Sequence, residues 1–123
     1  MRQFPMARHT TKWHLSAAED VIMNILWNSE TPMIKAEIVE EAKEKDVMCW
    51  QERSCFTILN HLLSKNLIQA VDLKKSGKAL ARAFAPTMSR PEYYANVVYD
   101  CVPAAEQREF RKFLRAKLTD ELA

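Results

Sequence analysis

Glycine is nearly absent from this chain, since Gly77 is the only one among 123 residues. Glycine-rich phosphate-binding loops and dinucleotide-binding fingerprints need several glycines at fixed spacing, and sheets of many strands need several tight turns. The sequence therefore argues against these architectures. It favours a mainly α-helical protein with little β structure.

Cysteine and histidine are also sparse, with three residues of each. The chain has no C-x-x-C, H-x-x-x-H or H-E-x-x-H motif, so the spacing gives little support to a zinc site or a disulfide framework. We expect free thiols, no metal and no cofactor. Cys55 and His61 should face opposite sides of one helix, so we expect no nucleophile–base pair and no enzymatic activity.

Long apolar runs are missing as well. No stretch approaches the roughly 18 apolar residues of a membrane-spanning helix, and residues 1–12 lack the apolar segment of a secretory signal. The composition, 48% hydrophobic and 28% charged, is typical of folded proteins. We therefore expect a cytoplasmic protein without membrane insertion.

The net charge is only +2, but it is unevenly distributed along the chain. Residues 1–12 carry three bases and no acid, and they are expected to form a flexible basic arm. Residues 13–49 hold three bases and eight acids, whereas residues 50–90 hold seven bases and two acids. A basic block inside a nearly neutral protein indicates a localised anion-binding surface.

Apolar periodicity predicts two helices before this basic block. Ser16 and Glu19 have the spacing of a capping box, which predicts a helix over 17–28. A second helix is predicted over 35–45, with its glutamates (Glu37, Glu40, Glu41 and Glu44) on the outer side. That acidic surface would repel phosphates.

The segment Gln51–Ser64 has an unusual polar face. Its apolar stripe, at helical spacing, consists of Cys55, Ile58, Leu59, Leu62 and Leu63. The opposite side carries Arg53, Ser54, Phe56, Thr57, Asn60, His61 and Ser64. A helix that is merely exposed would normally carry Glu/Lys pairs there, so this face suggests a reading surface. Phe56 either touches a thymine methyl or packs at a helix junction.

A basic hairpin is predicted next. Residues 67–73 and 79–85 have strand character, and the turn 74–78 between them contains Gly77. The cations Lys74, Lys75 and Lys78 cluster on this turn, and Arg82 follows on the return strand. Asn66 is expected to end the preceding helix in the left-handed region.

Two further helices are predicted over 90–100 and 104–122, separated by Pro103. Their aromatic and aliphatic stripes cannot be buried by such short helices alone. They must pack back on their own chain or against a partner chain, and we expect a homodimer. The predicted interface comprises Tyr93, Tyr94, Val97, Val98, Phe110, Phe113, Leu114 and Leu118.

Three helices followed by a basic hairpin are the layout of a winged helix-turn-helix domain. We expect a basic arm (1–12), a DNA-binding winged-helix domain (13–88) and C-terminal dimerisation helices (89–123). The predicted DNA-binding residues are Gln51, Arg53, Ser54, Thr57, Asn60, His61, Lys74, Lys75, Lys78 and Arg82. The helical residues would read bases, and the hairpin cations would neutralise phosphates.

Three segments resemble the penicillinase-repressor and methicillin-repressor family. They are Leu15–Trp27, Ala36–Glu41 and the tryptophan-led run Trp50–Lys65. The resemblance implies a homodimeric repressor on a near-palindromic operator of double-stranded DNA. It also implies a membrane sensor protease that inactivates the repressor by cleavage. The C-terminal part has no Asn-Phe pair like the cleavage motif of such repressors, which argues against proteolytic release here.

Two other classes of function stay open on the sequence. A winged-helix module could bind a protein instead of DNA, with Phe56 and Trp50 as anchors. Retained dimerisation without salt-sensitive DNA binding would favour that alternative. An enzyme is the weaker alternative, because the sequence offers no arrangement of catalytic groups.

Overall fold

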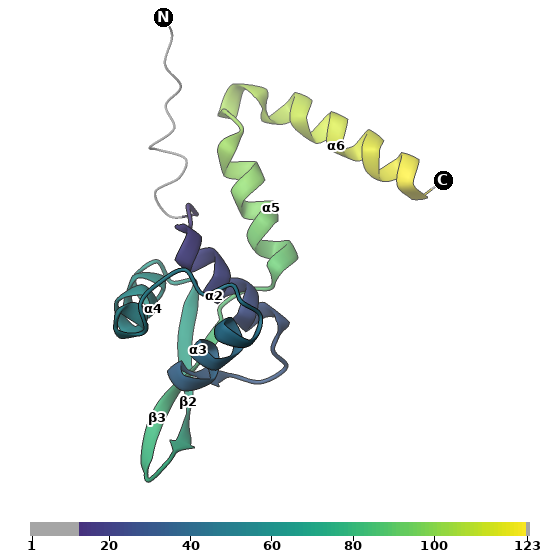
Figure 1. The fold of residues 1–123 in the computed structure, drawn as a ribbon. Helices are drawn as coiled ribbons and strands as arrows, with labels where there is room; N and C mark the ends of the chain where they lie inside the picture. Colours follow the sequence, from purple (N-terminus) through teal and green to yellow (C-terminus); the bar gives the residue numbers. More distant parts are fainter. Residues whose placement is uncertain (1–12, 123) are drawn as a thin grey trace, which may run out of the picture. The chain divides into compact units, whose positions relative to one another are not determined.

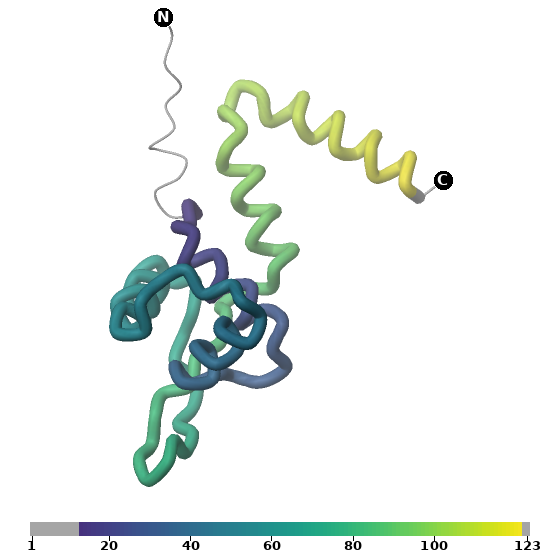
Figure 2. The backbone as a smooth tube through the Cα atoms, viewed as in Figure 1, coloured from purple at the N-terminus to yellow at the C-terminus, as the bar shows by residue number. Residues whose placement is uncertain are grey.

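The computed structural model describes residues 13–122, which form two compact units. One unit spans His14–Arg90, and the other combines Trp13 with the segment that begins at Pro91. Figures 1 and 2 show the path of the chain through each unit. The predicted basic arm, residues 1–12, lies outside the described residues.

The unit His14–Arg90 contains three α-helices and a small sheet (Figure 1). All strand pairs are antiparallel, and the strand order is β1-β3-β2. This is the winged helix-turn-helix arrangement predicted above. The elements are α2 (Ala17–Asn28), β1 (Met33–Ile34), α3 (Lys35–Glu44), α4 (Cys55–Ser64), β2 (Ile68–Ser76) and β3 (Ala79–Pro86).

The start of α2 is the predicted capping box. The Ser16 hydroxyl accepts a hydrogen bond from the Glu19 backbone at 3.2 Å, and the Glu19 carboxylate accepts one from the Ser16 backbone at 2.8 Å. Two backbone donors that the helix itself cannot satisfy are thereby paired. The predicted bounds 17–28 are confirmed.

The core lies between the three helices and the sheet. Burial of these side chains removes apolar surface from water, at roughly 1.5–3 kcal/mol for each large residue. Three core side chains, Cys55, Leu59 and Leu62, come from the predicted stripe of α4, whereas Ile58 and Leu63 are half-buried. The largest fully buried side chains are Phe84, Ile22, Met23, Ile38, Leu59, Leu62, Leu67 and Ile68.

The hairpin turn is shorter than predicted. We expected a turn over 74–78, but β2 continues through Ser76, which pairs with Ala79. Only Gly77 and Lys78 connect the two strands, and Gly77 has φ +64°. A two-residue connection requires this left-handed backbone, which glycine adopts without steric cost.

The first turn of the predicted helix 51–64 also differs. Residues Glu52–Ser54 form a 3-10 turn (η1), in which the Ser54 N–H donates to the Gln51 carbonyl at 2.8 Å. The α-helix proper begins at Cys55. Its other end is as expected, because Asn66, the residue after the C-cap Lys65, has φ +60°.

The second unit contains α5 (Arg90–Cys101, of which Pro91 onward belongs to this unit), a 3-10 turn η2 (Ala104–Glu106) and α6 (Gln107–Leu122). The tube in Figure 2 shows the turn that joins the two helices. The Trp13 and Tyr93 rings pack edge to face with centroids 5.9 Å apart. The Tyr93 hydroxyl donates to the Trp13 carbonyl, and the Trp13 indole N–H donates to the Asp100 carboxylate. Within residues 13–122, no helix is both long and apolar enough to cross a bilayer.

Candidate nucleic-acid interface

The polar side of α4 and of its leading turn is exposed. Its buried side holds Cys55, Leu59 and Leu62 against the core, and this burial raises the pKa of the Cys55 thiol. His61 lies on the exposed side, as predicted. The predicted reading residues Gln51, Arg53, Thr57, Asn60 and His61 are all exposed, and Ser54 is half-buried. These predicted reading side chains are therefore accessible, with Ser54 only partly so.

Two sets of contacts fix the end of α4. The Lys65 ammonium lies 3.0 Å from both carboxylate oxygens of Glu19 and donates to the His14 carbonyl at 2.8 Å. The Thr87 hydroxyl donates to the Asn66 carbonyl at 2.8 Å. The end of α4 is consequently held against the start of α2 and against Thr87, which follows β3.

The contacts of Glu19 with Ser16 and Lys65 favour the charged form of its carboxylate. Burial acts to raise the pKa of Glu19, but hydrogen bonds from Ser16 and the ion pair with Lys65 outweigh it, so the pKa lies below its ordinary value. The side chain is 6% exposed, against 23% for Lys65. A buried charge of this kind is tolerated because its partner and its hydrogen bonds are both present.

The hairpin cations divide into two groups. The Lys74 ammonium lies 3.1 Å from a Glu37 carboxylate oxygen and 3.0 Å from the Pro32 carbonyl oxygen. It joins the hairpin to the start of α3. The other predicted phosphate-binding residues, Lys75, Lys78 and Arg82, are exposed.

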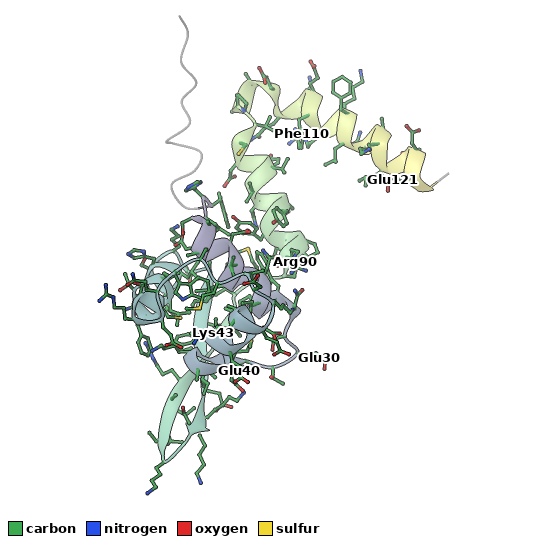
Figure 3. All side chains as sticks on the ribbon, viewed as in Figure 1. Glu30, Glu40, Lys43, Arg90, Phe110 and Glu121 are labelled. Atoms are coloured by element: carbon green, nitrogen blue, oxygen red, sulfur yellow. The ribbon has the colours of Figure 1, made fainter. Side chains whose placement is uncertain are left out.

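The acidic side of α3 also differs in part from the expectation. Glu40 and Glu44 are exposed as predicted, but Glu37 and Glu41 are half-buried. Glu37 accepts a hydrogen bond from the Ile34 backbone, which lowers its pKa against the opposing effect of burial, and Lys74 lowers it further. Figure 3 shows the Glu40 and Lys43 side chains on α3.

A groove of about 690 Å³ opens between α3, the start of α4 and the hairpin. On its wall the Lys35 ammonium lies 4.7 Å from the centre of the Phe56 ring, which is 51% exposed. Lys43 pairs with Glu52 at 2.8 Å on the same wall and lowers the pKa of that carboxyl. Lys35 is absent from the predicted site. The sequence feature that could have pointed to Lys35 is its position, because a cation at the first residue of a helix is unfavourable beside the positive end of the helix dipole.

The predicted interface residues of α5 and α6 are mostly accessible in the single chain. Tyr94, Val98, Phe113, Leu114 and Leu118 are exposed, while Val97 and Phe110 are half-buried. Tyr93 differs from the prediction of burial between chains. It is only 4% exposed within its own chain, and its ring and hydroxyl contact Trp13. Figure 3 marks Phe110 near the start of α6.

The unit His14–Arg90 thus has the winged-helix architecture, with an accessible polar helix and a basic hairpin, that many DNA-binding regulators share. The profile described as penicillinase repressor matches residues 15–123. Because this match covers most of the sequence, the chain belongs to the penicillinase repressor family. It is thus a DNA-binding repressor in its broad function.

The sequence matches no curated protein. A crystal structure described as that of a transcriptional regulator is similar at a TM-score of 0.49 and 14% identity. The similarity covers 94% of this chain and 85% of the other.

Proposed function

We propose that this chain represses transcription as a homodimer that binds a near-palindromic operator sequence-specifically. The observation that carries the proposal is that α4 has one buried side and one exposed side. Its apolar side is buried in the winged-helix core, while Arg53, Thr57, Asn60 and His61 remain exposed. In this proposal α4 enters the major groove of the operator.

Arg53 and Asn60 supply the main base contacts. An arginine donates two hydrogen bonds to the acceptors of guanine, and an asparagine pairs with the donor and acceptor of adenine. Each such pair contributes about 1–3 kcal/mol of discrimination. Additional hydrogen bonds to the DNA come from Gln51, Ser54, Thr57 and His61.

The exposed hairpin cations neutralise phosphates. Lys75, Lys78 and Arg82 release counterions on binding and supply affinity that does not depend on sequence. Lys74 instead holds the hairpin against α3 through Glu37. Glu40 and Glu44 of α3 are exposed and would repel phosphates, so the operator backbone is expected to lie nearer to the hairpin cations than to these carboxylates.

The helices α5 and α6 form the dimer. Phe113, Leu114 and Leu118 leave an apolar stripe uncovered on the described chain, and a second copy would bury the same stripe in an isologous interface. A two-fold protein requires a two-fold operator, with half-sites about one or two helical turns apart.

Selection of bound sequences from random duplex DNA tests this function. The expected result is a near-palindromic consensus that Arg53→Ala and Asn60→Ala each bind at least tenfold more weakly. Lys45→Ala, at the far end of α3, is the matched control and should bind normally. Selection of no consensus, or unchanged affinity of both α4 variants, would contradict the assignment of α4 as the reading helix.

A further inference from the structure

An aromatic ring and a cation meet beside the proposed reading surface, and the proposed function leaves both unused. Phe56 is the second residue of α4, and Lys35 is the first residue of α3. The Lys35 ammonium lies 4.7 Å from the centre of the Phe56 ring. Only the fold brings these two residues together, because 20 residues separate them in the sequence.

Core packing does not account for the Phe56 side chain. Its neighbour Cys55 and the residues Leu59 and Leu62 fill the core from α4, whereas the Phe56 side chain leaves 51% of its surface exposed. Exposing a phenyl ring to water opposes folding by the same hydrophobic effect that stabilises the core. The ring therefore presents apolar surface at the edge of a face that otherwise offers polar groups.

The charges around the ring favour a position next to a polyanion. Lys35 and Arg53 line the same groove as Phe56, and the nearby carboxylate of Glu52 is paired with Lys43 at 2.8 Å. The uncompensated charge close to the ring is thus positive. Glu40 lines the groove one turn further along α3.

We propose that Phe56 contacts the C5-methyl group of a thymine in the operator and that Lys35 binds a phosphate beside that thymine. The inference rests on the proposed function, since it requires α4 in the major groove. The thymine methyl is the apolar group that bases present there, and phenylalanine is one of the side chains suited to it. The cation over the ring neutralises a phosphate while the ring covers the methyl group.

Replacing thymine by uracil removes only the methyl group and leaves base pairing intact, so it tests this contact directly. The probe is the duplex obtained by selection, with each thymine replaced in turn. At one thymine per half-site, the wild-type protein should bind the uracil duplex about threefold to tenfold more weakly, as expected for one buried methyl group. A uracil outside the selected consensus is the control and should leave the affinity unchanged.

Variants of Phe56 test whether this ring causes the preference for thymine over uracil. Phe56→Ala should bind thymine and uracil duplexes equally, whereas Phe56→Leu should keep part of the preference. Phe56 is half exposed, so neither change opens a core cavity, and thermal melting will verify that both variants fold. Retention of the full preference by Phe56→Ala would overturn the inference.

Lys35→Ala should lower the slope of log affinity against log salt by about 0.9, the value for one phosphate contact. Lys45→Ala, at the other end of α3, should leave the slope unchanged. An unchanged slope for Lys35→Ala would overturn the phosphate contact.

The two proposals fail in different ways. If the wild-type protein selects no duplex, the proposed function fails. If it selects a consensus but binds thymine and uracil equally, or selects no thymine in contact with α4, only the Phe56 assignment fails.

Discussion

The Lys65 ammonium lies 3.0 Å from both carboxylate oxygens of Glu19, and this ion pair joins the end of α4 to the first turn of α2. The same carboxylate closes the capping box with Ser16. A single acidic side chain thus fixes both the start of one helix and the orientation of another. The proposed reading surface is thus held in place by residues outside the proposed set of DNA contacts.

Replacing the cation of this pair should destabilise the fold. In Lys65→Met the Glu19 carboxylate stays largely buried without its partner, and we expect a loss of about 2 kcal/mol in the free energy of unfolding. Urea denaturation followed by circular dichroism measures this value. The control is Lys45→Met, which breaks a partly exposed pair with Glu41 and should cost less than about 0.5 kcal/mol. Equal losses for the two variants would contradict the role of the Lys65 pair.

Stability should fall in acid because of Glu19 and Glu37. Both carboxyl groups have a pKa below their ordinary value of 4.5. A group whose pKa is lower in the folded protein stabilises it above the unfolded pKa, and that contribution is lost as the pH falls through the folded pKa. Unfolding free energy should therefore be steady from pH 7 to about pH 5 and decrease below about 4.5. Glu19→Gln should be less stable at pH 7 and show a shallower acid decrease, and an unchanged acid profile would contradict this.

Two adjacent lysines of the hairpin should behave differently. Lys75 is exposed, so Lys75→Ala should lower the salt slope of operator binding by about 0.9. Lys74 is paired with Glu37, so Lys74→Ala should leave that slope nearly unchanged and reduce thermal stability instead. Fluorescence anisotropy at several salt concentrations measures the slopes. Identical slopes for the two variants would show that the ion pair with Glu37 does not persist on DNA.

The apolar stripe of α6 should control assembly. Leu118→Glu places a charge in the proposed interface, where its burial without a partner is unfavourable. Sedimentation equilibrium at micromolar concentration should show a dimer for the wild type and a monomer for the variant. Lys117→Glu, a charge change at the neighbouring position, is the control and should remain dimeric. A monomeric wild type would remove the proposed dimer.

The local elements followed from the sequence wherever short-range chemistry decides them. The capping box of Ser16 and Glu19 fixed the start of α2, and Asn66 marked the end of α4 because its left-handed backbone is easily adopted by asparagine. The length of the hairpin turn could not be predicted so well. It depends on how far cross-strand pairing continues, and the pair Ser76–Ala79 extends the strands to the turn.

The amino-acid order by itself determined the winged-helix layout, the apolar stripe of α4 and the basic hairpin, because periodicity and turn chemistry act over a few residues. Only the tertiary structure decided which of these side chains remain available for binding a partner. It paired Lys74 with Glu37, buried Tyr93 within its own chain and set Lys35 over Phe56. Each of these outcomes joins residues at least 21 positions apart or depends on burial by other segments, and such contacts arise only when the whole chain packs.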